Sequence, residues 1–200
     1  RRLNSMRWIE VGPQRAVQLD AEPAGLPTEG YLWLDVRHDE AIADPEVLRS
    51  AVERVAKIRI FDLHLQDAVY LQHPSYFDST NQYDMLVFRR LAASSGTDTV
   101  PLATRPARSG PPILRRIDTS PVGFVVMENV LLSVHPSDCT VRDTYADRLL
   151  QNSASDAKAV GARTPTSPPD LMLRIVNTMV DGFLELRREL NHQLDHWQLE

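Results

Sequence analysis

The stretch that most constrains the fold of this 200-residue chain is its last one, residues 167–200. It opens with Ser167-Pro-Pro-Asp170, where a serine and an acid three residues apart match a helix capping box and proline occupies the first turn. After this start only Gly182 interrupts the helical pattern, and helices tolerate a single glycine. Apolar residues recur at intervals of three or four: Met172, Ile175, Met179, Phe183, Leu186, Leu190, Leu194 and Trp197. The pattern predicts one long amphipathic helix.

Such a helix spans roughly 50 Å at 1.5 Å per residue, which is more than a small domain can cover. It carries six acidic and three basic side chains and therefore much of the negative charge of the chain. We expect its distal part to pack against another helix or another subunit.

Composition indicates one globular domain, or one domain with an appendage, because 42% of the residues are hydrophobic and 24% are charged. The net charge of −5 argues against a nucleic-acid partner or an anionic membrane surface and permits cation binding. The single cysteine, Cys139, excludes an internal disulfide and favours a reducing compartment such as the cytosol. No apolar run reaches the ~20 residues of a membrane span, and the first residue is Arg1, so we expect a soluble fragment of a longer protein.

The first half of the chain predicts strands followed by helices. Residues 6–10 and 15–19 form an edge pair with Pro13 in the turn, and residues 31–36 form a central strand that ends near Asp35. Asp44-Pro45-Glu46 starts a helix. Residues 61–91 then predict a helix, a break at His73-Pro74 and a strand over residues 83–91.

The second half predicts a hairpin and a helix between two loops. Residues 92–112 and 151–166 are rich in small and polar residues, and we expect both to be mobile. Residues 113–117 form a strand, and residues 122–127 and 130–134 form a hairpin closed by Glu128-Asn129. Asp138 caps a helix over residues 140–150.

Common catalytic and nucleotide-binding signatures are absent from the sequence: it has no GxGxxG, phosphate loop, GxSxG, HExxH or CxxC. Three histidine pairings have spacings that suit a shared cation, although each also suits an ordinary solvated surface. They are His38 with Asp39, His64 with Asp67, and His192 with His196.

A family resemblance rests on four segments and the last helix, in order. The segments are Leu32-Trp33-Leu34-Asp35, Leu65-Gln66-Asp67-Ala68-Val69, Gln72-His73-Pro74 leading to the strand from Tyr83, and the hairpin VGFVVMENVLLSVH over residues 122–135. The last helix continues PDLMLRIVNTMVDGF from Pro169. Together they resemble the N-terminal cytoplasmic domain of the CorA family of divalent-cation transporters, including its ZntB-like zinc branch.

The resemblance implies an α/β fold in which a mixed β-sheet lies between helical layers. Residues 1–166 would form the α/β/α domain, and residues 167–200 the long helix of the same domain. It also implies a non-catalytic regulatory and assembly role in an Mg²⁺/Co²⁺ or Zn²⁺ transporter, at the cytoplasmic face of the inner or plasma membrane. The partners would be further copies in a homopentamer, and membrane contact would come only through spans that this chain lacks.

The resemblance also points to one metal ligand. In magnesium-transporting members, paired acids of the short helix help bind a regulatory cation between subunits. Asp67 matches the second acid, whereas Gln66 replaces the first and should weaken the site; His73-Pro74-Ser75 stands where the family has Arg-Pro-Lys. We expect no required cofactor and a regulatory Mg²⁺ or Zn²⁺. The two departures from the family pattern, at Gln66 and at His73-Pro74-Ser75, favour a ZntB-like or otherwise divergent member.

Two alternatives remain open from the residues alone. One is a free-standing scaffold that self-associates through the acidic last helix. The other is a small metal-dependent hydrolase built on His38, Asp39, His64 and Asp67, which requires these side chains to converge.

Overall fold

The computed structural model describes residues 6–92, 118–154 and 163–197. Its centre is a seven-stranded sheet with the order β2-β1-β3-β7-β6-β5-β4. The strands are β1 Arg7–Val11, β2 Ala16–Leu19, β3 Tyr31–Arg37, β4 Tyr76–Ser79, β5 Asp84–Leu91, β6 Thr119–Val126 and β7 Val130–His135. Neighbouring strands are antiparallel except β3 and β7, which are parallel, so the sheet is mixed.

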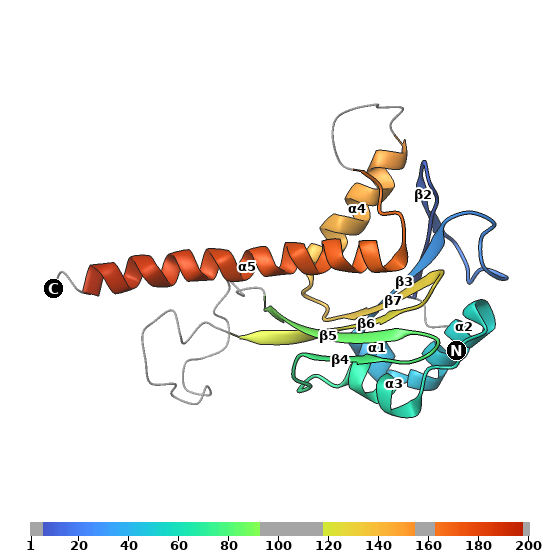
Figure 1. The fold of residues 1–200 in the computed structure, drawn as a ribbon, viewed down its shortest axis with the longest axis horizontal. Coiled ribbons are helices and arrows are strands. Elements are labelled where there is room, and N and C mark those ends of the chain that lie inside the picture. The colour runs from blue at the N-terminus through green and yellow to red at the C-terminus, as the bar shows by residue number, and fades with distance from the viewer. Residues whose placement is uncertain (1–5, 93–117, 155–162, 198–200) are drawn as a thin grey trace.

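Helices cover both faces of the sheet (Figure 1). One layer contains α1 His38–Ala43, α2 Pro45–Ala56 and α3 Asp62–Val69; the other contains α4 Thr140–Ala154 and α5 Pro168–Trp197. Each layer closes its own hydrophobic core against the sheet. The expected α/β architecture, with a mixed sheet between helical layers and a long C-terminal helix, is confirmed.

Strand β3 shows why this sequence makes a central strand. Leu32, Leu34 and Val36 belong to the core under α1–α3, whereas Tyr31 and Trp33 belong to the core under α4 and α5. A strand that is buried on both faces reads as a continuous apolar run instead of an alternating one. Asp35 is the charged exception, and its surroundings are described below.

Helices α2 and α5 begin where their capping residues predict. The Asp44 carboxylate accepts a hydrogen bond from the Val47 N–H at 3.2 Å, with Pro45 as the first helical residue. The Ser167 hydroxyl accepts from the Asp170 N–H at 3.4 Å, and the Asp170 carboxylate accepts from the Thr166 N–H at 3.0 Å. These contacts satisfy backbone donors that have no partner inside the helix.

The structure corrects several sequence-based predictions. Helix α1 and strand β4 were not predicted, and α4 extends to Ala154, into the stretch expected to be a loop. His38 was expected at a solvated strand end and is instead only 4% exposed. The strand predicted over residues 113–117, most of the loop over 92–112 and residues 155–162 lie outside the described residues.

Helix α5 covers the sheet only along its first half. Leu171, Ile175 and Met179 are buried, and Phe183 makes an edge-to-face contact with Phe88 of β5, with ring centroids 6.4 Å apart. The helix then continues away from the sheet (Figure 1). Leu194, on the predicted apolar stripe, is 51% exposed.

Within the described part of the chain, no helix has the length and apolar character needed to cross a membrane.

Candidate functional site

The predicted metal ligand, Asp67, lies on α3 beside an exposed apolar surface. Leu63 and Tyr70 are four residues before and three residues after it, and therefore share its side of the helix. Both are more than half exposed. Asp67 is half-buried between them, and Gln66 next to it is exposed. We call this region, with His73 and Tyr76, the α3–β4 surface.

Asp67 pairs with His73, in the loop between α3 and β4. The Asp67 Oδ1 lies 3.4 Å from the His73 Nε2, and neither side chain is more than 18% exposed. The other ring nitrogen, Nδ1, lies 2.8 Å from the carbonyl oxygen of Pro74. The His73 ring also packs on Tyr76, with centroids 5.4 Å apart. A helix residue and a loop residue thus form a compact polar pair.

A single chain does not supply an all-oxygen cation site at Asp67. In the described ranges, no group of three or more His, Cys, Asp or Glu side chains is placed to hold a metal ion. Mg²⁺ needs near-octahedral oxygen coordination, and here the chain offers it one carboxylate with a neutral Gln66 alongside. The geometry therefore does not fit a magnesium site built by one copy alone.

The other predicted histidine pairs are separated by the fold. His64 does not join Asp67, because its two ring nitrogens contact the Tyr83 hydroxyl at 2.8 Å and the Asp78 carboxylate at 3.0 Å. His38 is buried in α1, and the exposed Asp39 binds Arg37. The convergence that a hydrolase would need is therefore absent among the described residues. His192 is exposed on α5, and the side chain of His196 lies outside the described set.

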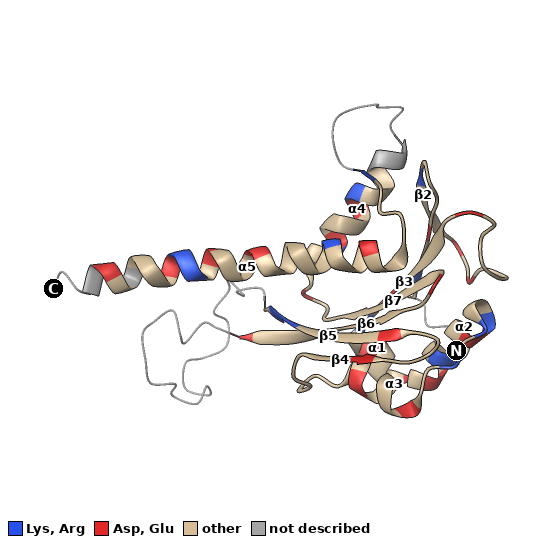
Figure 2. Cartoon of the chain, in the orientation of Figure 1, with Lys and Arg blue, Asp and Glu red and all other residues tan. Residues whose placement is uncertain are grey.

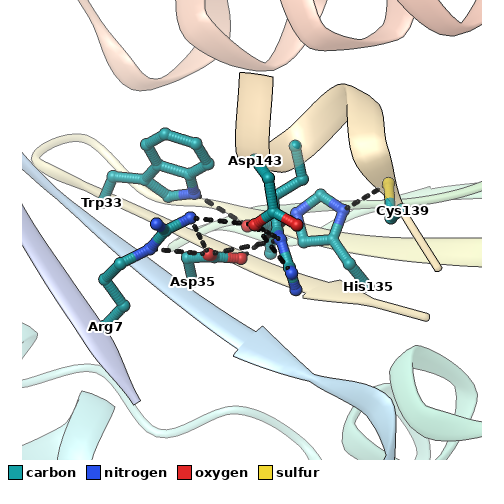
Figure 3. Close-up of polar contacts among 8 residues, drawn as sticks. Arg7, Trp33, Asp35, His135, Cys139 and Asp143 are labelled. Carbon is teal, nitrogen blue, oxygen red and sulfur yellow. Dashed lines mark hydrogen bonds and ion pairs between the residues drawn. The ribbon is translucent and has the colours of Figure 1, made fainter. Parts of the chain in front are cut away.

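A second cluster, buried under α4, surrounds Asp35 (Figure 3). Two nitrogens of Arg7, on β1, donate to the Asp35 Oδ2 at 2.8 and 3.1 Å. Arg142 of α4 approaches the same oxygen at 3.7 Å, and the Nε2 of His135, on β7, lies 3.5 Å from the other oxygen. The cluster therefore ties three strands and a helix together.

Electrostatics in this cluster follow from burial. Burial raises the pKa of the Asp35 carboxyl, against the opposing charges of Arg142 and Arg7. Burial also lowers the pKa of His135 well below its usual value, and the charges of Arg142 and Arg90 act in the same direction. The Cys139 sulfur lies 3.7 Å from the His135 Nδ1. The side chains of Cys139, His135 and Asp35 therefore contact one another in that order.

This order of thiol, imidazole and carboxylate is that of a nucleophilic catalytic arrangement, yet the cluster is closed. Cys139 and His135 are fully buried and Asp35 is 3% exposed, and burial raises the pKa of the Cys139 thiol. A reactive cysteine needs access and a lowered pKa, so this thiol is inert. We assign the cluster a structural role.

A shallow surface pocket of about 370 Å³ lies elsewhere, at the ends of two hairpins and the start of α5. Asp84 and Glu128 line it together with Ser167. None of the residues singled out from the sequence as a metal ligand borders it.

Sequence reasoning missed His73 as the partner of Asp67. In the sequence, His73 was noted as the break after the helix and as the position where the family has arginine. It was not paired with Asp67, because six residues separate them and no helical or strand period relates them. The signal that could have found it is the His-Pro break itself, since a chain that reverses after a short helix returns along that helix.

These features define a class of protein. It has a mixed sheet between helical layers and a long terminal helix, and the residues that the structure describes form no open catalytic centre. Solved structures with this fold include the full-length CmaX protein and proteins of the CorA and ZntB type. The sequence itself matches no family model and no curated protein.

Three solved structures show the extent of the likeness. The CmaX protein matches with a TM-score of 0.67 at 10% identity, over 96% of this chain and 49% of that one. The CorA magnesium transporter from Methanocaldococcus jannaschii matches with a TM-score of 0.60 at 12% identity, over 96% of this chain and 50% of that one. The ZntB cytoplasmic domain from Vibrio parahaemolyticus matches with a TM-score of 0.59 at 12% identity, over 92% of this chain and 62% of that one. The chain thus has the fold of CorA and ZntB cytoplasmic domains and spans about half of the two full-length proteins.

Proposed function

We propose that this chain is the cytoplasmic regulatory and assembly domain of a CorA-like divalent-metal transporter and has no catalytic activity. The observation that carries the proposal is the match over nearly the whole chain to a magnesium transporter and to a ZntB cytoplasmic domain. The buried state of the only triad-like cluster found in the described residues supports a non-enzymatic role.

In this proposal the ion path lies in membrane segments beyond this chain. The match covers half of the full-length CorA structure, which leaves the other half of that protein without a counterpart here. The domain would sit at the cytoplasmic face of the membrane and touch the membrane only through those segments.

The assembly part of the proposal is a homo-oligomer, a pentamer in the complete protein. Two surfaces support it. The distal part of α5 carries exposed Leu184 and Leu194, and the α3–β4 surface exposes Leu63 and Tyr70. Exposed apolar residues that gather on one surface are typical of a face that packs against a partner.

The regulatory part of the proposal places a divalent cation at Asp67. The site would be incomplete in one chain, because the described residues offer too few ligands there. A neighbouring copy or water would supply the remaining positions, and the cation would link the metal concentration to the contact between subunits.

The test is the coding sequence beyond Glu200 in the parent gene. We expect two apolar spans of ~20 residues each within roughly the next 130 residues. If the gene ends near Glu200 or continues without such spans, the transporter proposal fails and the self-associating scaffold takes its place. Ion flux through the complete protein with and without residues 1–200 then measures the regulatory role.

A further inference from the structure

A row of charged and polar side chains crosses the sheet beneath α4. Arg7 lies on β1, Asp35 on β3, His135 on β7 and Arg90 on β5, which places them across five neighbouring strands. His135 is at the centre of this row and is completely buried. Its Nε2 faces the Asp35 Oδ1 at 3.5 Å, and its Nδ1 faces the Cys139 sulfur at 3.7 Å. Protein groups therefore enclose both ring nitrogens.

The charge around His135 does not suit a second proton on its ring (Figure 3). Asp35 is the one acid among the buried polar side chains in the described part of the chain. Its Oδ2 already accepts from Arg7, and Arg142 approaches the same oxygen. Burial, with the charges of Arg142 and Arg90, keeps the pKa of His135 well below its ordinary value. An imidazolium at this position would be one more buried cation beside a single buried carboxylate.

Every element packed around His135 contributes charged or titratable groups. They are Arg7 of β1, Asp35 of β3, His38 of α1, Arg90 of β5, Asp138 and Cys139 of the turn before α4, and Arg142 and Asp143 of α4.

Helix α4 depends on these polar contacts for its attachment to the sheet. Arg142 of α4 approaches the Asp35 carboxylate at 3.7 Å, and Asp138, just before the helix, binds Arg90 of β5. In the described part of α4, the buried apolar side chains are Ala146 and Leu149. A helix with so little buried apolar surface separates from the sheet at a lower free energy than the sheet itself unfolds.

We propose that the cluster around Asp35 makes the attachment of α4 sensitive to acid: α4 stays on the sheet while His135 is neutral, and protonation of His135 releases α4 while the sheet remains folded. This inference goes beyond the proposed function and does not depend on it. In the released state the imidazole reaches water and binds protons normally, so acid favours release. Because α4 shares a core with the first half of α5, release would uncover part of the face on which α5 packs.

The single cysteine of the chain, Cys139, reports on this release. It is buried against His135 while α4 is attached, and it becomes accessible when α4 separates. The rate of its reaction with 4,4′-dithiodipyridine, divided by the rate for an unstructured cysteine peptide at the same pH, measures the released population. One histidine whose pKa returns to near 6.5 on release should raise this population about 30-fold between pH 7.5 and pH 5.

Two histidine variants separate His135 from the rest of the chain. His135→Gln removes the titrating ring, so the ratio between the two pH values should fall below about threefold. His192→Gln removes an exposed histidine of α5 and should keep the full change. The readout is the ratio within each variant, so a general loss of stability in His135→Gln does not imitate the result. A parent chain without the increase, or an equal increase in His135→Gln, overturns the inference.

Hydrogen exchange of the unmodified chain distinguishes release of α4 from global unfolding. After correction for the intrinsic exchange rates, amides of residues 140–150 should lose protection at pH 5, whereas those of β3 and β7 should keep it. Equal loss of protection in α4 and in the central strands would mean global unfolding and would contradict the inference. Neither measurement involves a metal ion or segments beyond Glu200, so this inference and the transporter proposal fail separately.

Discussion

His38 and His135 are imidazoles that the fold buries in a neutral state. Burial lowers the pKa of His38 to about 4, and the nearby charge of Arg90 acts in the same direction. The unfolded chain binds a proton at a pKa near 6.5. Because the unfolded state then holds more protons than the folded state in the range between these values, stability falls as the pH falls from about 6.5 towards 4.

This linkage predicts acid sensitivity at a single residue. His38 alone should cost about 2 kcal/mol of unfolding free energy between pH 7.5 and pH 5, and His135 adds to the loss. His38→Phe removes the titrating group and should flatten the pH dependence by that amount in urea unfolding. His192→Gln, which removes an exposed histidine, is the control. An unaltered slope in His38→Phe would show that His38 is not the group responsible.

A glycine in β6 decides how closely α3 approaches the sheet. A Cβ at Gly123 would lie 2.7 Å from the carbonyl oxygen of Ala68 and 3.0 Å from its Cα. Both are backbone atoms of α3, so the whole helix would have to move.

Gly123→Ala should therefore destabilise the chain by about 1–3 kcal/mol, the usual cost of overpacking a well-packed contact. Thermal or urea unfolding measures the change. Gly25→Ala is the matched control, since nothing lies within 4 Å of a Cβ there, and its effect should stay within about 0.5 kcal/mol. Equal stability of the two variants would contradict the close approach of α3 to β6.

Helix α5 gives the molecule its elongated outline (Figure 1) and shows both signs of charge along its distal part (Figure 2). Leu184 is 47% exposed and Leu194 is 51% exposed. An amphipathic helix gains most of its stability from packing its apolar face, so a free distal half is poorly stabilised. A second copy of the chain is the simplest partner.

We therefore predict that the chain self-associates through α5. Light scattering should give a mass that is a multiple of the 22.6 kDa chain and that falls in the double variant Leu184→Glu/Leu194→Glu. Leu26→Glu, at a similarly exposed leucine in the loop between β2 and β3, should leave the mass unchanged. A monomer at every concentration would exclude this contact.

Most elements could be predicted because their signals are local. Each of these signals spans only a few residues. Examples are Pro45 after Asp44, the apolar run at Tyr31 and the two-residue turn at Glu128-Asn129. Helix α1 and strand β4 could not be predicted for the opposite reason. The exposed strand Tyr76–Ser79 has no apolar alternation, and only pairing with β5 makes it a strand. The α1 helix has six residues, too few to show a helical period.

The sequence by itself determined the long terminal helix, the central strand and the hairpin, because propensity, capping and periodicity depend on neighbours in the chain. Only the tertiary structure decided that β3 pairs in parallel with β7, that His38 is buried, and that His73 faces Asp67. These outcomes depend on contacts between residues distant in sequence, and the free energy of such contacts is set by packing and burial, which no local pattern encodes.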